Sequence, residues 1–372
     1  MHIRAAILWE QGAPLSVETA QLEDPGPGEV LVEVRAAGVC HSDLHPARGD
    51  WPMRTPVVLG HEGAGIVRAV GAGVARLEPG DHVVFCWAPA CGHCPPCADG
   101  RPVLCDRLEK TTYRNRLPSG GTRLRARDTA VQPFLSTACF ADHAVLAEEG
   151  AIRVPRDLPF ESLAALGCAV VTGVGAVINA ARVPSGASVA VIGAGGVGLN
   201  VVQGATIARA AKIIAVDRQP APLALAEAFG ATDRAQISES ASEAVRELTG
   251  GRGADYVFDT VGTPATLADA LTCAKKGGTV VLTGLSRVDA QASIPLFPFV
   301  MQEKRLVGSV YGSGQPLRDI PRLVELYQEG RLKLRELAAR TYSLDQVNDA
   351  LAALAASQGA RGIISWASPP RT

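Results

Sequence analysis

The run SVAVIGAGGVG at residues 188–198 constrains the fold of this chain more than any other feature of its sequence. A short stretch rich in β-branched residues leads directly into closely spaced glycines, and a helical stretch, LNVVQGATIARA, follows. A glycine turn between a strand and a helix lets backbone amides surround a phosphate at the helix N-terminus. A glycine pattern alone is weak, but this context predicts a dinucleotide-binding unit. Its predicted cofactor contacts are Gly193, Gly195, Gly196, Val197 and Gly198.

The next apolar run, KIIAVD, ends in Asp217, about 20 residues after the glycine turn. A carboxylate at this place accepts hydrogen bonds from both ribose hydroxyls and repels a 2′-phosphate, which favours NAD over NADP. Arg218 follows directly and is also a candidate cofactor contact, because a neighbouring arginine can serve NADP. The alternative for Arg218 is a solvated loop charge.

Strand-like and helix-like segments continue to alternate, which predicts a doubly wound parallel sheet of the α/β class. In order, LALAEAFGA is helical, DYVFDTVG is a buried strand, ATLADALTCAKKGG is a helix closed by glycine and TVVLTG is another strand. Upstream, VLVEVRAAGVC, GIVRAV and DHVVFC predict a strand-rich first domain. Downstream, the amphipathic helices PRLVELYQEGRL and LDQVNDALAALAAS precede a last strand, RGIISW.

Size and charge limit the class of protein further. A chain of 372 residues is too long for one ordinary core, so we expect two domains. A net charge of −1 argues against nucleic acid or an anionic membrane as the main partner. The uncharged stretches 162–181 and 183–208 are glycine-rich, which favours buried elements over membrane spans. The first residues lack the pattern of a signal peptide, so we expect a cytoplasmic protein.

Four of the nine cysteines lie in the stretch CGHCPPCADGRPVLC, residues 91–105. Four thiolates on a Gly/Pro-rich loop can surround one tetrahedral Zn²⁺ and leave no coordination position open, which makes such a site structural. A redox pair would leave two of the thiols without a role, and the net charge speaks against a nucleic-acid-binding zinc ribbon. The predicted ligands are Cys91, Cys94, Cys97 and Cys105.

A second set of metal-binding side chains is spread along the chain. Cys40 lies in GVCHSDLH, His61 in LGHEGAG and Cys168 in LGCAVVTG. One imidazole and two thiolates would leave the fourth position of a zinc ion open for a substrate oxygen. Each residue alone is more often a core or surface residue, but acidic Asp43 and Glu62 stand beside the set. Asp43 is predicted to orient His61 through the second ring nitrogen.

With these motifs in hand, the chain resembles the zinc-dependent alcohol dehydrogenases of the medium-chain dehydrogenase/reductase family over essentially its whole length. The resemblance rests on GHEGAG, the four-cysteine loop, the GAGGVG turn and the terminal RGII strand, in this order. It implies a GroES-like β-barrel catalytic domain, residues 1–169 and 311–372, and a Rossmann NAD-binding domain, residues 170–310. It also implies two zinc ions per chain, one catalytic and one structural.

The resemblance assigns roles to individual residues. Cys40, His61 and Cys168 would carry the catalytic zinc, with Glu62 as the occasional alternate ligand. Ser42 would accept the alcohol proton and pass it through the nicotinamide ribose to His45, which exchanges protons with water. Further cofactor contacts would be His41, Thr172, Val261, Thr283, Leu285 and Arg361.

The sequence also departs from parts of this family. Pro222 stands where a cofactor-binding lysine often follows Asp217, so we expect somewhat weaker NAD binding. Trp51 and Glu109 replace an acidic residue and an arginine of the glutathione-dependent formaldehyde branch, which counts against that activity. Residues between Cys105 and Phe140 match the long insertion of the dimeric members, so we expect a homodimer that pairs strand 305–310 across a two-fold axis.

The sequence therefore predicts an NAD-dependent zinc alcohol dehydrogenase that interconverts alcohols with aldehydes or ketones. Trp51 and Trp87 would line the substrate pocket and favour primary alcohols, including allylic and benzylic ones, unless both are core aromatics. Two alternatives stay open at this point. One is a thiol-adduct or formaldehyde dehydrogenase, and the other is a non-catalytic, zinc-stabilised NAD-sensing protein that would hold one metal per chain.

Overall fold

The computed structural model describes residues 1–338, 340–356 and 361–366. The chain forms two compact units. The first contains Met1–Cys168, Gln315–Gly330 and Leu334–Thr372, and the second contains Ala169–Gly314 and Arg331–Lys333. The sequence predicted two changes of domain, at residues 169–170 and 310–311. The units of the structure change at 168–169 and 314–315, and the short segment Arg331–Lys333 also belongs to the second unit.

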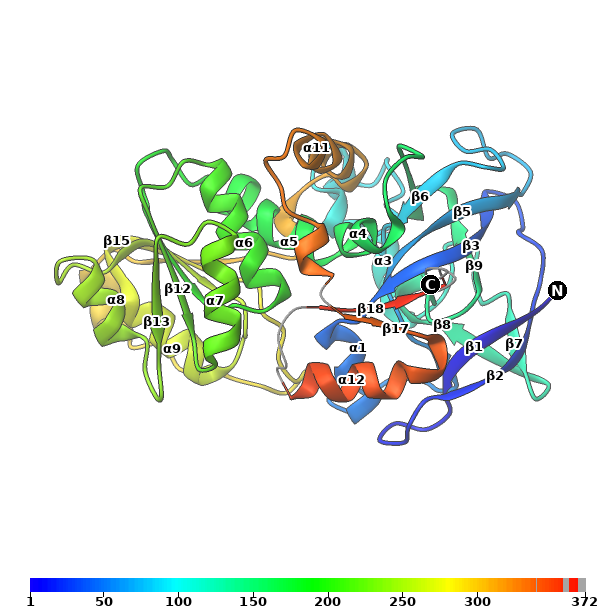
Figure 1. The fold of residues 1–372 in the computed structure, drawn as a ribbon, viewed down its shortest axis with the longest axis horizontal. Helices are drawn as coiled ribbons and strands as arrows, with labels where there is room; N and C mark the ends of the chain where they lie inside the picture. Colours follow the sequence, from blue (N-terminus) through cyan, green and yellow to red (C-terminus); the bar gives the residue numbers. More distant parts are fainter. Residues whose placement is uncertain (339, 357–360, 367–372) are drawn as a thin grey trace, which may run out of the picture. The chain divides into compact units, whose positions relative to one another are not determined.

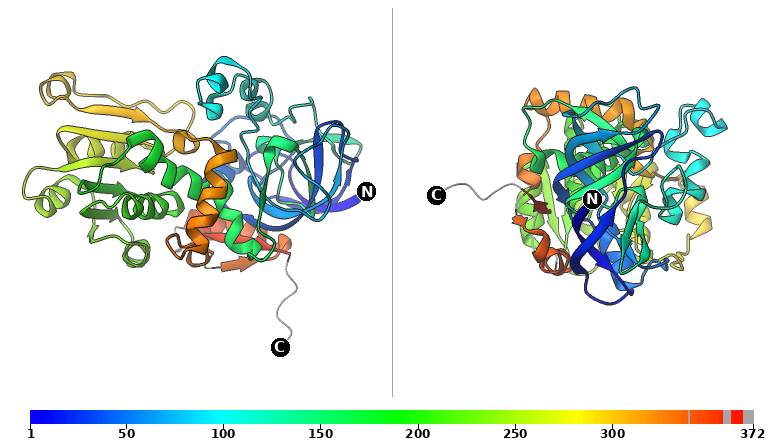
Figure 2. Two further views of the ribbon diagram at one scale, coloured as in Figure 1. Left: turned by 90° about the horizontal axis from the view of Figure 1, so that it is seen from above. Right: turned by 90° about the vertical axis from the view of Figure 1, so that its right-hand side faces the viewer.

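The first unit is built from two groups of strands (Figure 1). A closed five-stranded barrel has the order β1-β2-β7-β8-β4. Its strands are β1 (His2–Leu8), β2 (Ser16–Leu22), β7 (Leu124–Ala126), β8 (Thr129–Pro133) and β4 (Val57–Val58). The views in Figure 2 show the N-terminus of the chain at this barrel. Because β7 and β8 both lie between Cys105 and Phe140, the predicted insertion supplies two strands of the barrel instead of lying outside it.

A seven-stranded sheet completes the first unit, in the order β10-β6-β5-β3-β18-β17, with β9 also paired to β3. Its strands are β3 (Glu29–Gly38), β5 (Glu62–Val70), β6 (His82–Phe85), β9 (His143–Ala147), β10 (Ala151–Val154), β17 (Arg340–Tyr342) and β18 (Gly362–Ser365). The helices are α1 (His41–Arg48), α2 (Pro95–Ala98), α3 (Arg107–Lys110), α4 (Phe160–Ala164), α11 (Pro316–Gln328) and α12 (Val347–Ala355). Strand β18 brings the C-terminal part of the chain onto β3, directly before Cys40.

The second unit is a six-stranded sheet in the order β13-β12-β11-β14-β15-β16, and every neighbouring pair is parallel. This is the order of the doubly wound dinucleotide-binding fold. Its strands are β11 (Ser188–Ile192), β12 (Lys212–Asp217), β13 (Asp233–Gln236), β14 (Ala254–Asp259), β15 (Ala274–Leu282) and β16 (Arg305–Gly308). Its helices are α5 (Ala169–Gly175), α6 (Gly196–Ile207), α7 (Pro220–Ala228), α8 (Ser242–Leu248), α9 (Pro264–Cys273) and α10 (Leu296–Met301).

Strand β11 in the middle of this parallel sheet is buried on both faces, as its near-continuous apolar sequence predicts. Ala190 and Ile192 of β11 share a core with Leu267 and Leu271 of α9, while Val191 between them points to the other face and is also fully buried. The fold predicted from the sequence is confirmed. One boundary differs, because the predicted helix through AKKGG ends at Cys273, and the following residues begin β15.

The two uncharged stretches lie in buried helices and strands, as expected. Among the described residues, no single helix is both long and apolar enough to cross a membrane. One bent pair of helices, Phe160–Gly167 and Ala169–Ala181, meets those limits by length and composition only.

Candidate metal centre and cofactor turn

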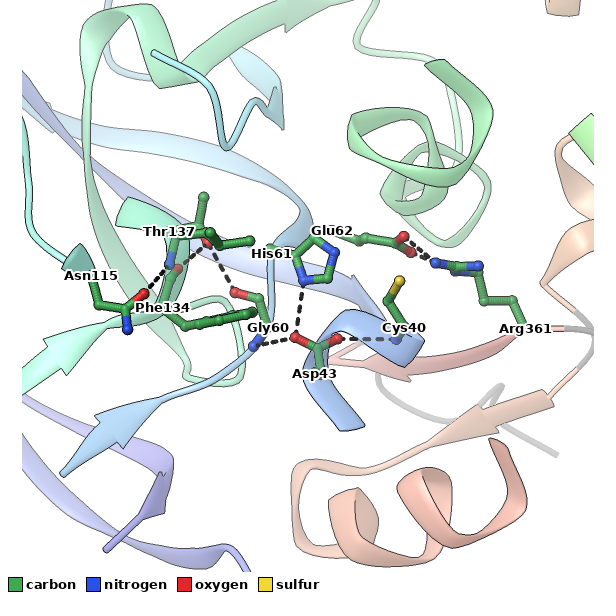
Figure 3. Close-up of polar contacts among 10 residues, drawn as sticks. Cys40, Asp43, Gly60, His61, Glu62, Asn115, Phe134, Thr137 and Arg361 are labelled. Atoms are coloured by element: carbon green, nitrogen blue, oxygen red, sulfur yellow. Dashed lines mark hydrogen bonds and ion pairs between the residues drawn. The ribbon is translucent and has the colours of Figure 1, made fainter. Parts of the chain in front are cut away.

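Four metal-binding side chains meet in the first unit, although they come from distant parts of the chain. The ligand atoms of Cys40, His61, Glu62 and Cys168 all lie within 4.8 Å of one another, and all four residues are buried. Cys40 follows β3 and caps the N-terminus of α1, while His61 directly precedes β5, which begins at Glu62 (Figure 3). Cys168 follows a short 3₁₀ turn after α4. The sheet therefore brings together the donor set that the sequence analysis singled out.

The imidazole of His61 shows that this set fits a metal ion. Its Nδ1 lies 2.9 Å from Oδ1 of Asp43, which places the ring hydrogen on Nδ1. Its Nε2 is buried and has no hydrogen-bond partner within the described part of the chain. A buried ring nitrogen without a partner is costly unless a ligand takes it up, and Cys40 and Cys168 supply two sulfur donors beside it. Two thiolates and one imidazole are a zinc donor set with one open position.

Asp43 fixes the geometry of this cluster. The residue is fully buried, and Oδ1 accepts hydrogen bonds from the backbone N–H of Gly60, 3.0 Å away, as well as from His61. Its Oδ2 accepts from the backbone N–H of Cys40, also at 3.0 Å. The Asp43 carboxylate thus holds the backbone at Cys40 and next to His61, and it also orients the His61 ring. Partners that orient metal ligands typically make such contacts.

The ionisable groups of the cluster perturb one another strongly. A hydrogen bond from the Cys168 thiol and the charge of Arg361 lower the pKa of Cys40 well below its ordinary value, whereas the same contact raises the pKa of Cys168. Burial opposes the charged form of His61, but Asp43 raises its pKa above the ordinary value overall. Burial raises the pKa of Glu62 to about 7. Mutual shifts of this kind are concentrated at functional sites.

Glu62 has a further partner that the sequence did not suggest. The Nε of Arg361 donates to Oε2 of Glu62 at 2.6 Å, and a second guanidinium nitrogen donates to Oε1. Both side chains are buried. The resemblance assigned Arg361 to the cofactor; in this structure its guanidinium holds the Glu62 carboxylate.

Helix α1 carries the residues predicted for proton transfer. Ser42 and His45 lie on its first two turns, and His41 at its first position is exposed. The Nδ1 of His45 lies 3.1 Å from Oδ2 of Asp50, and its ring stacks on Trp51 with the ring centroids 4.8 Å apart. Asp50 and Trp51 thus fix the orientation of the His45 imidazole.

The two tryptophans predicted for the substrate pocket differ in their surroundings. Trp51 is partly buried and packs against the core of the first unit as well as against His45. Trp87 lies just beyond the end of β6 and is only 9% exposed. The structure therefore gives Trp51 core contacts of the kind that the alternative interpretation expected.

The other four cysteines also converge. The sulfur atoms of Cys91, Cys94, Cys97 and Cys105 lie within 4.8 Å of one another, although three of these residues are only partly buried. The backbone N–H of Cys91 points to Sγ of Cys105 at 3.2 Å, and that of Cys94 points to Sγ of Cys91 at 3.4 Å. A hydrogen bond from the backbone of His93 lowers the pKa of Cys91 to about 6. Burial and the neighbouring thiols raise the pKa of Cys97 to about 12. This donor set fits one tetrahedral zinc ion without an open position.

The glycine turn lies between β11 and α6, as its sequence predicts. Gly193 has a φ of +91°, a conformation that favours glycine, and a Cβ at Gly198 would lie 1.8 Å from the carbonyl oxygen of Gly193. A Cβ at Gly195 would meet no atom within 4 Å, so the space in front of the turn is open. The turn therefore has the close helix–strand packing and the free approach that a pyrophosphate requires.

Asp217 ends β12 beside this turn, and its carboxylate is already engaged. Oδ2 accepts from the backbone N–H of Ala194 at 2.8 Å, and Oδ1 accepts from that of Gln219 at 2.9 Å. Each oxygen keeps a second lone pair for a ribose hydroxyl. Arg218 is exposed. Among the remaining cofactor candidates in this unit, Val261 and Leu285 are exposed, while Thr172 and Thr283 are buried.

Sequence reasoning missed several residues around His61. The ring of Phe134 meets the imidazole edge to face, with the centroids 5.8 Å apart, and Thr137 donates to the carbonyl oxygen of Gly60 at 2.9 Å. The sequence offered one hint, the glycine directly before His61. In the structure Gly60 has a φ of +87°, a conformation that favours glycine. Nothing in the local sequence links residues 134–137 to His61.

Comparison with known proteins agrees with this site. Residues 26–156 match the family described as "Alcohol dehydrogenase GroES-like domain", and residues 196–329 match "Zinc-binding dehydrogenase". The chain is 40% identical over 368 residues to the NDMA-dependent alcohol dehydrogenase of Amycolatopsis methanolica, covering 98% of this chain and 99% of that protein.

Two solved structures are similar over nearly their full length. An alcohol dehydrogenase zinc-binding domain protein from Burkholderia ambifaria is 38% identical with a TM-score of 0.93, covering 99% of this chain and 100% of that one. Benzyl alcohol dehydrogenase from Acinetobacter calcoaceticus is 32% identical with a TM-score of 0.93 and the same coverage. Together with the two family matches, these relatives show that the chain belongs to the zinc-dependent alcohol dehydrogenases of the medium-chain dehydrogenase/reductase family.

Proposed function

We propose that this member of the family is NAD-dependent and interconverts primary alcohols, including allylic and benzylic ones, with their aldehydes. The observation that carries the proposal is the buried set of Cys40, His61 and Cys168, in which the Nε2 of His61 has no partner among the described residues. A zinc ion held there would polarise the alcohol oxygen and lower the pKa of its proton. The nicotinamide of the second unit's cofactor would take the hydride.

The residues of this chain would supply orientation and proton transfer. Asp43 holds the His61 ring with its hydrogen on Nδ1, so that Nε2 remains a ligand atom. Ser42 would accept the alcohol proton, because a hydroxyl can accept and donate at the same time. His45 would exchange that proton with water, and the contact of its Nδ1 with Asp50 leaves Nε2 for the exchange.

Preference for NAD is supported by the carboxylate of Asp217 at the end of β12. Its two oxygens retain acceptor capacity for the ribose hydroxyls, and its negative charge repels a 2′-phosphate. Exposed Arg218, which follows Asp217 directly, would favour NADP, and Pro222 on α7 offers no side-chain donor. We therefore expect NAD selectivity with moderate affinity.

We also propose two zinc ions per chain and a homodimer. The four-thiol cluster supports the second zinc ion. A homodimer is supported by strand β16, which lies at the end of the sheet order, and by the neighbouring helix α10, which has no buried residue. The large side chains Leu296, Phe297, Val300 and Met301 of α10 are 67–77% exposed, an apolar surface that a second copy would cover. A cytoplasmic location stays a prediction.

A substrate and acceptor screen tests the proposed function. Purified protein is assayed with short, branched, allylic and benzylic alcohols, each with NAD⁺, NADP⁺ or NDMA as the acceptor, and zinc per chain is measured on the same sample. We expect NAD⁺ reduction with primary and benzylic alcohols and two zinc ions. Turnover with NDMA but no release of NADH would instead assign this chain the acceptor dependence in the name of its Amycolatopsis relative.

The same screen separates the two alternatives. Faster turnover of S-hydroxymethylglutathione than of any alcohol would favour the thiol-adduct dehydrogenase, although Trp51 and Glu109 argue against it. One zinc ion and no turnover with any acceptor would favour the non-catalytic, NAD-sensing protein.

A further inference from the structure

The segment from Phe134 to Ala138 has an unusual backbone for residues that are not glycine. Leu135, Ser136 and Ala138 have φ angles of 48°, 60° and 55°, all in the left-handed region. Side chains with a Cβ rarely adopt this conformation, and it is least favourable for residues other than Asn and Asp. Three such residues within four positions persist only where the surroundings impose them, and such segments concentrate at functional sites.

The surroundings that impose this backbone come from residues 112–116. Asn115, which is itself left-handed and buried, accepts a hydrogen bond from the backbone N–H of Leu135 through Oδ1 at 3.1 Å. The hydroxyl of Ser136 donates to the carbonyl oxygen of Arg116 at 2.6 Å and lies 3.0 Å from the hydroxyl of Thr112. The long segment between Cys105 and Phe140 therefore braces its own strained end.

The strained segment in turn forms a hydrogen bond with the peptide group between Gly60 and His61. Thr137 Oγ1 lies 2.9 Å from the carbonyl oxygen of Gly60 and 2.8 Å from that of Phe134, so its single hydrogen is shared between them. The backbone N–H of Cys139 also donates to the Gly60 oxygen, at 3.0 Å. That oxygen belongs to the peptide group between Gly60 and His61 (Figure 3). The rotation of this peptide is therefore fixed from the side of the Phe134–Ala138 segment.

Side-chain packing adds a second constraint on the same residue. The Phe134 ring meets the His61 ring at 79°, and Phe134 is buried. A Cβ at Gly60 would lie 2.5 Å from the Phe140 ring, so the backbone at Gly60 has no room to shift in that direction. Asp43 holds Nδ1 of His61 and the N–H of Gly60, while Thr137 holds the carbonyl oxygen of Gly60 and the Phe134 ring packs on the imidazole. The imidazole is thus clamped between two independent groups of residues.

We propose that Thr137, braced through Asn115, is a positioning residue that sets the affinity and coordination geometry of the catalytic metal by fixing the Gly60–His61 peptide. The inference rests on the proposed function, because it takes His61 as a zinc ligand. It gives the strained segment a role beyond packing, since a relaxed backbone at Leu135–Ala138 would release the carbonyl oxygen of Gly60. In this role Thr137 and Asn115 act through His61 and not on the substrate directly.

The test compares Thr137→Val, which keeps the shape but lacks the hydroxyl, with Thr137→Ser, which restores the donor. Thr122→Val is the matched control, because Thr122 also donates to a carbonyl oxygen within the same segment, that of Val131 at 2.6 Å. For each holoprotein we would measure zinc transfer to a chromophoric chelator, the visible spectrum after Co²⁺ substitution and Tm.

Thr137→Val should weaken zinc binding at the catalytic site about 10–100-fold and shift the Co²⁺ bands, as expected when an outer-shell contact is lost. Thr137→Ser should restore both, and Thr122→Val should change only Tm. Wild-type zinc transfer and an unchanged Co²⁺ spectrum in Thr137→Val would overturn the proposal, as would equal zinc loss in Thr122→Val.

If Thr137→Val does not fold, Asn115→Gly provides the test of the proposal instead. Glycine tolerates the left-handed backbone at this position, and the substitution removes the acceptor for Leu135 together with the weak contact of the Asn115 amide with the Met53 sulfur at 3.7 Å. This variant should also lose zinc faster than the wild type, and unchanged zinc transfer would count against the role of Asn115 and Thr137. A wild-type protein that binds no metal at Cys40, His61 and Cys168 would instead refute the proposed function.

Discussion

Arg361 and Glu62 are 299 positions apart in the chain, yet they form a buried ion pair, and Glu62 belongs to the cluster of Cys40, His61 and Cys168 that fits a metal ion. The guanidinium donates to both carboxylate oxygens, which restrains the rotation of the Glu62 side chain. A carboxylate restrained in this way can act as an alternate ligand only if the pair opens. The pair thus links the last strand of the first unit to the chemistry at Cys40.

Replacing Arg361 with methionine tests which partner this arginine serves. If its main role is to hold Glu62, the variant should lose on the order of 3 kcal/mol of unfolding free energy, since one partner of a buried pair is removed. Its KM for NAD⁺ should change little. Urea unfolding and steady-state kinetics measure the two effects. A large rise in the KM for NAD⁺ with unchanged stability would show instead that Arg361 contacts the cofactor, as the resemblance implies.

The two cysteine clusters should have separable roles. Cys94→Ser should lower Tm and solubility, because none of residues 91–102 is buried and the loop therefore lacks a core that could hold it without the metal. Cys40→Ser should abolish turnover with a much smaller effect on Tm, because the sheet around it retains its core. Metal analysis, thermal melts and activity on both variants check this division. It is wrong if the wild-type protein holds a single zinc ion or if Cys94→Ser is fully stable.

Zinc affinity of the four-thiol cluster should rise steeply with pH. The pKa of Cys97 is raised to about 12 and that of Cys105 is also raised, so both thiols carry protons near neutral pH in the metal-free protein. Cys91, with a pKa of about 6, is already a thiolate. Zinc must therefore displace at least two protons, and its affinity should increase roughly a hundredfold per pH unit. Chelator competition between pH 7 and 8.5, a range below both raised pKa values, measures how the zinc affinity changes with pH. A zinc affinity that does not depend on pH would contradict this prediction.

Cofactor choice should depend on the charge of Asp217. Asp217→Asn keeps one acceptor oxygen for the turn but removes the repulsion of a 2′-phosphate, so the preference for NAD⁺ over NADP⁺ should fall by about tenfold or more. Asp217→Gly should reduce it further, at some cost in stability, because Ala194 and Gln219 lose their acceptor. The ratio of kcat/KM for the two cofactors is the measurement. Equal use of both by the wild type would mean that Arg218 dominates.

Substrate shape should depend on Trp87 more than on Trp51. Trp87→Ala should raise the relative efficiency with secondary alcohols, by about 10–200-fold per excluded carbon if the indole lines the substrate slot. Trp51→Ala should act mainly through His45, which loses its stacking partner, and should alter the pH profile of alcohol oxidation. A wild-type preference for secondary or cyclic alcohols would place both indoles in the core instead.

The sequence by itself determined the local features, which depend on a few residues that are close together in the chain. The strand, the glycine turn and the helix at residues 188–207 are encoded locally, because β-branched residues, glycines and small helix formers each restrict the backbone directly. The four cysteines of residues 91–105 reach one another for the same reason, since a short loop cannot separate them far. The class of fold followed from the period of the apolar residues.

Only the tertiary structure decided which distant residues surround the metal ligands. Pairing of β18 with β3 carries Arg361 to Glu62, and the folding of residues 106–139 into the barrel carries Phe134 and Thr137 to His61. No spacing in the sequence encodes these contacts, because they depend on how strands far apart in the chain pair and pack. A local pattern can name the ligands of a metal, but the residues that orient those ligands are selected by the packing of the whole unit.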